Sequence, residues 1–318
     1  MTTLRWLRWA QSTRECAHPI RGGDGLEEAP TRFGVSIVPS ASGRADPVSE
    51  ALRAERLGFD LVSVWDHPIG DRPSFETWTL LTWIASRTDR IGLATNVLGL
   101  PFRLPALTAK MAETLDRLSE GRVTLGLGGG GNDREIAGIG APGRTPPEKV
   151  EALEEGLAVI RGVWSRSPFS FEGRHYRNDA ALLEPKPARP IPIWLGTYGP
   201  KALELTGRRA DGWIPSMPYL PPRLARSRMD IVRAAAEGEG RDPSALDYAY
   251  NVSVRVGGEP ADDPERQVAG EPDEVVERLL ELAESGFTVL NIWLGGRREE
   301  QLDRFAGEVM PALRRLIA

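Results

Sequence analysis

The chain has 318 residues, of which 41% are hydrophobic, enough to bury one sizeable core. Its formal net charge is −5, so it lacks the basic excess with which nucleic-acid-binding proteins neutralise phosphates. No apolar run approaches the roughly 20 residues of a membrane span, and the single cysteine, Cys16, cannot form an internal disulfide. We therefore expect a soluble, cytoplasmic protein with no nucleic-acid or membrane partner.

Residues 1–30 carry scattered arginines and prolines and no continuous apolar stretch, so they do not read as a secretory signal. We interpret them as a polar, disordered N-terminal tail, with Trp6 and Trp9 able to dock on a surface as the alternative. No linker-like change of composition follows residue 45. Residues 31–318 are therefore predicted to form a single catalytic domain.

From Phe33 onward, a short β-branched run, a polar or glycine turn and an amphipathic helical pattern repeat. The predicted strands are Phe33–Val38, Leu61–Trp65, Ile91–Val97, Val123–Leu127, Pro192–Leu195, Gly212–Ile214, Tyr248–Val256 and Thr288–Leu294. The predicted helices include Pro47–Leu57, Phe75–Arg87, Pro105–Leu118, Glu148–Trp164, Pro272–Ser285 and Glu299–Leu316. Alternating strands and helices predict parallel pairing. Eight such units favour closure into a (β/α)8 TIM barrel over a doubly wound open sheet.

One segment breaks this rhythm. Residues 165–191 form an insertion before the fifth strand, with a predicted hairpin over Phe169–Tyr176 around Glu172-Gly173 and a proline-rich stretch from Glu184 to Pro192. Such an insertion either shapes the mouth of a pocket or forms a surface flap, and both interpretations remain open.

The loops that follow barrel strands carry the function of a TIM barrel. The second strand runs into Asp66 and His67, and His67 is the histidine at a strand end, since His18 lies in the tail and His175 in the hairpin. An imidazole there can transfer a proton or bond a cofactor, whereas a turn cap is the alternative. Asp66 either orients His67, bonds a cofactor or caps a helix.

Three further strand ends are candidate cofactor contacts. Thr95, Asn96 and Val97 end the third strand, where they suit a flat ring or simply pack the barrel. The fourth strand runs into a glycine-rich loop with Gly128, Gly129, Gly130 and Asn132, which suits a nest for phosphate or a polar ring edge. Its match to G-x-G-x-x-G is weak, because a proline-rich loop is expected to follow instead of a helix. A purely structural loop is the alternative.

The fifth strand runs into Gly196, Thr197, Tyr198 and Gly199 before Pro200 opens a helix. The free amides of that turn predict an anion site, with a simple strand-to-helix turn as the alternative. The sequence has no metal-ligand spacing and no nucleophile elbow. A bound cofactor is therefore expected to supply the chemistry.

These motifs together resemble the luciferase-like (bacterial luciferase) superfamily of flavin and deazaflavin oxidoreductases over about residues 33–316. The resemblance rests on residues 54–60 leading to 64–67, on 90–97, on 115–122 leading to 126–128, and on 192–200 leading to 210–213. It implies a tricyclic ring at the barrel mouth, a non-proline cis peptide at Asn96-Val97, and phosphate and chain contacts from the glycine runs. The pair Asp66-His67 looks like the branch that uses the deazaflavin coenzyme F420, in which the histidine assists hydride or proton transfer.

One departure concerns the substrate. The branch that oxidises a sugar phosphate has a Glu in the loop after the fourth strand, where this chain has Gly131. The resemblance therefore favours a small neutral substrate, and Trp65, Trp194, Trp213 and Trp293 would either line its pocket or pack the core. The alternatives are an FMN-dependent monooxygenase with a partner flavin reductase, and a non-catalytic flavin-binding protein without an acidic partner. The resemblance also implies a homodimer.

Overall fold

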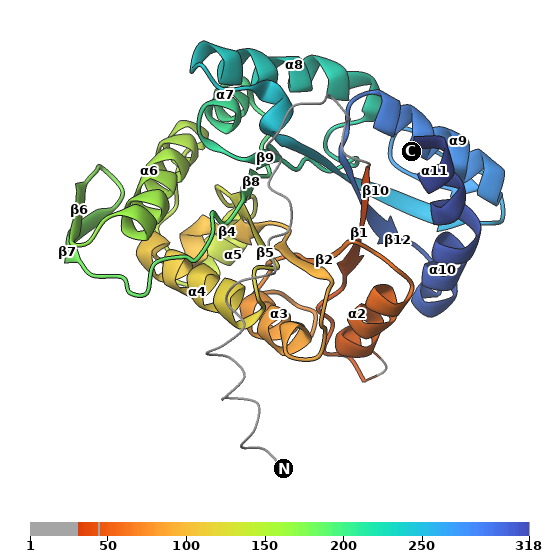
Figure 1. Cartoon of the computed structure of the whole chain (residues 1–318), viewed down its shortest axis with the longest axis horizontal. Coiled ribbons are helices and arrows are strands. Elements are labelled where there is room, and N and C mark those ends of the chain that lie inside the picture. Colours follow the sequence, from red (N-terminus) through yellow and green to blue (C-terminus); the bar gives the residue numbers. More distant parts are fainter. Residues whose placement is uncertain (1–30, 44, 318) are drawn as a thin grey trace.

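The computed structural model describes residues 31–43 and 45–317, so the predicted tail over residues 1–30 lies outside the described residues. Eight parallel strands form a closed barrel surrounded by helices, as Figure 1 shows from one end. These strands are β1 (Arg32–Ile37), β2 (Leu61–Val64), β3 (Gly92–Thr95), β5 (Val123–Gly128), β8 (Ile193–Leu195), β9 (Gly212–Trp213), β10 (Asp247–Val256) and β12 (Val289–Leu294). The ring closes where β12 pairs with β1 and β9 pairs with β10. The predicted TIM barrel is confirmed.

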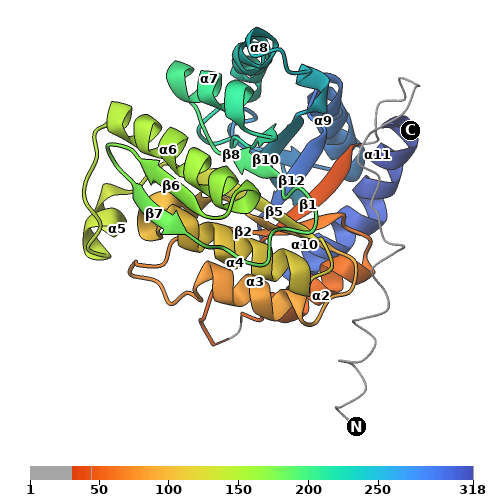
Figure 2. The ribbon, with the colours of Figure 1, turned by 60° about the vertical axis from the view of Figure 1, so that its left-hand side comes forward.

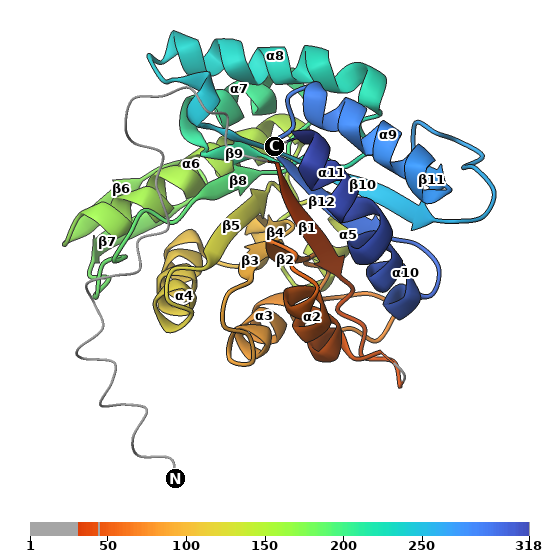
Figure 3. The same cartoon turned by 45° about the vertical axis from the view of Figure 1, so that its right-hand side comes forward.

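The helices pack their apolar faces on the outside of the strands, where the main core lies (Figure 3). They are α2 (Pro47–Arg56), α3 (Thr77–Ala85), α4 (Pro105–Leu118), α5 (Asp133–Gly138), α6 (Pro146–Ser165), α7 (Pro200–Arg209), α8 (Pro222–Gly238), α9 (Pro272–Glu284), α10 (Arg298–Arg304) and α11 (Met310–Ile317). A π-helical turn, Phe305–Val309, joins α10 to α11. Among the described residues, no helix is long and apolar enough to cross a membrane.

Local signals place several of these helix ends. The carboxylate of Asp46 accepts a hydrogen bond from the Ser49 amide and caps α2. A left-handed glycine, which accommodates a positive φ without a steric penalty, follows each of three helices: Gly58, Gly121 and Gly286. The predicted strand Ile91–Val97 is shorter than expected, because β3 ends at Thr95. The short strand β4 (Leu98–Gly99) then pairs with β5.

The insertion before β8 forms a hairpin of β6 (Phe169–Glu172) and β7 (Arg177–Ala181), which pair antiparallel. The hairpin lies against α6 on the outside of the barrel (Figure 2). The carboxylate of Glu155 on α6 accepts the backbone amides of Arg174, His175 and Tyr176 and so holds the turn. The hairpin thus packs on a helix of the outer layer.

The barrel interior is layered, because side chains alternate between its two faces along each strand. The lower interior layer is apolar and is formed by Leu61, Ala94, Trp194, Ile214, Ala249 and Val289. Two residues further along the strands, toward their carboxyl ends, the side chains are polar: Ser63, Asn96, Ser216, Asn251 and Asn291. Another two residues on, the half-buried Trp65 and Trp293 follow at the mouth. A polar layer therefore separates the apolar interior from an aromatic mouth, at the end of the barrel where function is expected.

Candidate functional site

A buried amide network spans the barrel just below its mouth. Asn251 is its centre: its Oδ1 accepts from Asn96 Nδ2 at 2.8 Å and from Asn291 Nδ2 at 2.6 Å. Its Nδ2 donates to Asn96 Oδ1 at 3.1 Å and to Ser216 Oγ at 2.9 Å. Ser63 joins Asn291 to Asn96. Because buried polar groups are stable only when they are satisfied, this network fixes the Asn96 side chain below the mouth.

The peptide bond between Asn96 and Val97 is cis, at the place that the resemblance implies. The Val97 side chain lies against two predicted cofactor-binding glycines: a Cβ on Gly128 would approach Val97 Cγ2 to 2.9 Å, and one on Gly196 would approach it to 3.1 Å. These two glycines therefore provide space for Val97. The hydroxyl of Thr95 donates to the Gly126 carbonyl at 2.7 Å, within the barrel wall.

The glycine run after β5 leads directly into the short helix α5, and not into a proline-rich loop as expected. Asn132 caps this helix, because its Oδ1 accepts from the amides of Arg134 and Glu135. Gly129 and Gly130 form the turn before it, and Gly130 has a positive φ of 86°. A Cβ on Gly131 would meet no atom within 4 Å. The loop is therefore open at Gly131.

His67 and Glu135 form a pair at the mouth of the barrel. His67 Nδ1 lies 2.8 Å from Glu135 Oε2 and 3.0 Å from Oε1. The His67 side chain is 53% exposed and that of Glu135 only 12%, and the indole of Trp65 lies beside the imidazole at 5.2 Å between ring centroids. The expectation that this site has no acidic partner is wrong, because α5 supplies a carboxylate four residues after Gly131. The motif Asn132-x-x-Glu135, a helix cap followed by an acidic residue, is the signal that predicts this helix start.

Asp66 occupies a different environment from its neighbour His67. Its Oδ2 accepts from Arg103 Nη1 at 2.8 Å and from the Gly99 amide at 2.9 Å, and its Oδ1 accepts from Arg103 Nη2 at 3.1 Å. Arg103 also donates to Glu76. Burial acts to lower the pKa of Arg103, but hydrogen bonds and charges from Asp66 and Glu76 outweigh it and raise that pKa. The structure therefore directs Asp66 toward Arg103 and not toward His67.

The loop after β8 contributes fewer free polar groups than the sequence suggested. The Thr197 hydroxyl bonds Thr206 on α7 at 2.7 Å, and its carbonyl accepts the indole N–H of Trp213. The Tyr198 hydroxyl accepts from the Ser216 amide at 3.1 Å, and burial raises the pKa of Tyr198. Gly199 caps α7 and, like Gly131, has open space at its Cβ position.

The four strand-end tryptophans separate into two pairs. Trp194 and Trp213 are fully buried in the core, whereas Trp65 and Trp293 are half-buried at the mouth. The indole N–H of Trp293 is buried and has no hydrogen-bond partner among the described residues. Within the described part of the chain, no group of three or more His, Cys, Asp or Glu side chains is placed to hold a metal ion. The mouth is therefore an aromatic and amide-lined site with one histidine.

The chain matches the luciferase-like monooxygenase family over residues 29–267 and therefore belongs to it, which confirms the resemblance. It is 30% identical to an F420-dependent glucose-6-phosphate dehydrogenase of Intrasporangium calvum, over 86% of this chain and 96% of that protein. It is also 32% identical to a 5,10-methylenetetrahydromethanopterin reductase of Methanolobus tindarius, over 77% of this chain and 74% of the reductase.

Solved structures share the fold. An F420-dependent secondary alcohol dehydrogenase, in complex with an F420–acetone adduct, matches with a TM-score of 0.81 over 90% of this chain and 99% of that chain. The F420-dependent tetrahydromethanopterin reductase of Methanopyrus kandleri matches with a TM-score of 0.77 over 90% of this chain and 100% of that chain. Both are 21% identical to this chain, so this likeness concerns the fold alone.

Proposed function

We propose that the chain is an oxidoreductase that uses a deazaflavin coenzyme of the F420 type for hydride transfer to or from a small, neutral organic substrate. The observation that carries the proposal is His67, which is half-exposed at the barrel mouth and paired with a carboxylate in a chain that is 30% identical to an F420-dependent glucose-6-phosphate dehydrogenase. An imidazole so placed can exchange a proton with a substrate. Hydride transfer is the chemistry that a bound deazaflavin supplies.

The residues at the mouth fit such a coenzyme. The orphaned N–H of Trp293 is a donor without a protein partner, and Gly131 and Gly199 leave open space on the loops after two adjacent strands. We propose that Thr95, Asn96 and Val97 support the ring, and that Gly128, Gly129, Gly130 and Asn132 hold the phosphate and chain. Gly196, Thr197, Tyr198 and Gly199 would complete that site. These roles are proposals that rest on position in the barrel.

A neutral substrate is proposed from the departure at Gly131 in the loop after β5. Gly131 provides no carboxylate where the sugar-phosphate branch has one. Lys149, which lies at the first turn of α6 after this loop, is held by Asp133 Oδ1 at 2.7 Å. A phosphate group would therefore compete with an existing ion pair for this cation.

The test is a titration of the purified protein with F420 and, separately, with FMN, followed by fluorescence. The proposal predicts tighter binding of F420 than of FMN. The reverse order would overturn it in favour of an FMN-dependent monooxygenase, which would require a partner flavin reductase. Binding of neither coenzyme would overturn both. Binding of F420 without turnover of any of a panel of alcohols and carbonyl compounds would favour a non-catalytic flavin-binding protein.

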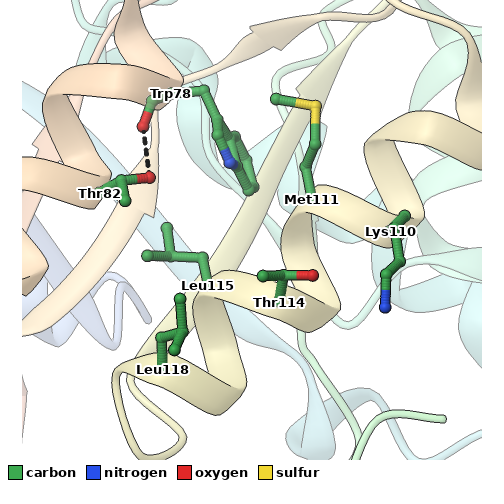
Figure 4. A pocket seen from close by; sticks show the side chains of 7 residues that line it. All are labelled: Trp78, Thr82, Lys110, Met111, Thr114, Leu115 and Leu118. Carbon is green, nitrogen blue, oxygen red and sulfur yellow. Dashed lines mark hydrogen bonds between the residues drawn. The ribbon is translucent and has the colours of Figure 1, made fainter. Parts of the chain in front are cut away.

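We also propose that the chain forms a homodimer through the outer surface of α3 and α4. A shallow groove of about 180 Å³ lies between them, lined by Trp78, Thr82, Lys110, Met111, Thr114, Leu115 and Leu118 (Figure 4). Leu118 at one end of this lining is 66% exposed, and Trp83 on α3 is 54% exposed. A large exposed apolar patch is typical of an interaction site.

A second copy is the occupant that the charges favour. A two-fold interface places a surface against itself, so like charges on it would repel. Helix α3 has no charged residue, and Lys110, the charged residue of the groove lining, is already paired with Glu113 Oε2 at 2.9 Å. Arg87, which follows α3, lies over the Trp83 ring at 4.9 Å from its centroid and is the cation nearest this surface's tryptophan. The surface also combines a groove with projecting side chains, as a self-complementary interface requires.

Light scattering coupled to size exclusion tests the homodimer. The double variant Trp83→Glu/Leu118→Glu should elute as a monomer, because four like charges would meet across the two-fold axis. Leu316→Glu, which changes a comparably exposed leucine on α11, should leave the dimer intact. A monomeric native protein, or a double variant that stays dimeric, would overturn this proposal.

A further inference from the structure

We propose that Glu135 is the positioning residue of this site: it holds the imidazole of His67 so that Nδ1 carries the proton and Nε2 is free to act. Glu135 is not among the site residues expected from the sequence. The consequence for hydride transfer rests on the proposed function, whereas the position and tautomer of the imidazole do not.

Within the described residues, the His67 imidazole is held through Nδ1 and not through Nε2. Both carboxylate oxygens of Glu135 lie within hydrogen-bond distance of His67 Nδ1, at 2.8 and 3.0 Å. An ionised carboxylate can only accept hydrogen bonds, so Nδ1 must carry the proton. Which ring nitrogen of a histidine is protonated is set by such a bond. The Nε2 lone pair is then left without a partner among the described residues.

The carboxylate is itself held in place. Asn132 Nδ2 donates to Glu135 Oε1 at 2.8 Å, while the Oδ1 of the same Asn132 caps α5. One asparagine therefore fixes both the start of the helix and the orientation of the acid. The Glu135 side chain is mostly buried, whereas His67 reaches into solvent. A buried, anchored acid that bonds an exposed histidine is arranged to orient it.

The neighbouring charged groups do not compete for this contact. Asp66 is the nearest carboxylate in sequence, but Arg103 and the Gly99 amide use both of its oxygens. Asp133, on the same turn of α5 as Glu135, pairs with Lys149 on α6. Glu135 is therefore the carboxylate that bonds His67 within the described residues.

With Nδ1 protonated, the free Nε2 of His67 can act as the general base or, once protonated, as the general acid. In the oxidation of a substrate alcohol, the Nε2 lone pair would accept the hydroxyl proton, and a bound deazaflavin would supply the hydride acceptor for the carbon that becomes a carbonyl. In the reverse direction Nε2–H returns the proton to the oxygen. The carboxylate of Glu135 stabilises the imidazolium that exists between these events, as an orienting acid does in hydrolase triads.

Long-range ¹H–¹⁵N NMR of the imidazole nitrogens tests the proposal on the full chain without any coenzyme. The His67 signals are assigned by their loss in His67→Ala. Under conditions in which the ring is neutral, native His67 should show the Nδ1–H tautomer. Glu135→Ala should shift it toward the Nε2–H form that free histidine favours. Glu135→Gln keeps an acceptor oxygen and should retain Nδ1–H.

Asp133→Ala is the matched control, because it removes one carboxylate from the same turn of α5 without touching His67. It should leave the tautomer unchanged. If F420-dependent turnover is found, Glu135→Ala should lower kcat by about 100-fold with little change in KM, and added acetate should restore part of the rate.

An Nε2–H tautomer in the native protein, or an unaltered tautomer in Glu135→Ala, would overturn the positioning role. The native spectrum decides this even if Glu135→Ala fails to fold. A correct tautomer in a protein that binds no F420 would instead leave the positioning role standing and overturn the proposed function.

Discussion

The two halves of the Asp66-His67 pair lie in opposite environments. The Asp66 side chain is fully buried, and Arg103 and the Gly99 amide occupy both of its oxygens. The His67 side chain is half-exposed and bonds one carboxylate through a single ring nitrogen. Adjacent residues therefore belong to two regions: a buried charge cluster of Asp66, Arg103 and Glu76, and a mouth pair of His67 and Glu135.

This difference in burial predicts a structural role for Asp66 and a chemical role for His67. A buried carboxylate whose lone pairs are satisfied could exchange a proton only by breaking bonds that hold the fold. An exposed imidazole with one free nitrogen can do so at little structural cost. The comparison predicts that changes in the buried cluster reduce stability, whereas changes in the mouth pair reduce turnover.

The largest expected effect is on the stability of the buried cluster. Asp66→Ala removes the acceptor of both Arg103 Nη1 and the Gly99 amide, and it leaves the mostly buried Arg103 with only the more exposed Glu76 as its partner. It should lower the free energy of unfolding by about 3–5 kcal/mol. Urea unfolding followed by circular dichroism measures the loss. Asp71→Ala, which removes an exposed carboxylate from the same loop, is the control and should stay near native. A loss below about 1 kcal/mol for Asp66→Ala would show that the cluster is not structural.

The mouth pair should give the opposite result. His67→Ala should lower kcat by about 100-fold or more, weaken coenzyme binding much less, and leave the urea midpoint nearly unchanged. His175→Ala is the matched control, because His175 also faces a carboxylate, Glu151 at 3.3 Å, but lies on the hairpin outside the barrel. Unchanged turnover in His67→Ala would remove the catalytic role of His67.

The sequence predicted the barrel because its signals are local and repeated. Each strand is a short apolar run, and caps such as Asp46 and glycines such as Gly58 mark helix ends within a few residues. The resemblance added the cis peptide at Asn96-Val97, which the structure contains. It also pointed to His67 at a strand end, where the structure places it.

Local sequence patterns could not predict which residues these side chains contact. Asp66 meets Arg103 37 positions later, and Asn251 meets Asn96 155 positions earlier, so only the closed barrel brings them together. Glu135 was missed for a different reason: the glycine run suggested a flexible loop, and α5 was not predicted. A lone asparagine inside an apolar strand, as at Asn251 and Asn291, is a weak signal of a buried polar layer.

A smaller effect should appear in acid, at the edge of the buried cluster. Burial acts to raise the pKa of Glu76, but hydrogen bonds from Thr79, Trp78 and Arg103 outweigh it and lower that pKa below its usual value of 4.5. The stabilisation is therefore present above this value and is lost as the pH falls through the lower pKa of the folded state.

Glu76→Gln should remove roughly 1 kcal/mol at neutral pH, after allowance for its partial exposure. It should also flatten the fall in stability below about pH 4.5. Urea unfolding across an acid series measures this slope. The exposed residue Glu172 is the control, and Glu172→Gln should leave the slope nearly unchanged. If Glu76→Gln lost stability in acid as steeply as the native protein, groups other than Glu76 would cause the acid sensitivity.

The smallest effect should come from adding a carboxylate to the open mouth. A side chain at Gly131 meets no atom within 4 Å, so Gly131→Glu should change the free energy of unfolding by no more than about 0.5 kcal/mol. Gly130→Glu is the matched contrast, because Gly130 has a φ of 86° and its Cβ would lie 2.8 Å from Ile136 Cδ1 and Pro101 Cγ. That variant should be clearly less stable in the same urea measurement. Equal losses in the two variants would mean that the chain is as constrained at Gly131 as at Gly130, and the mouth would then not be the open region that the contrast with the buried cluster requires.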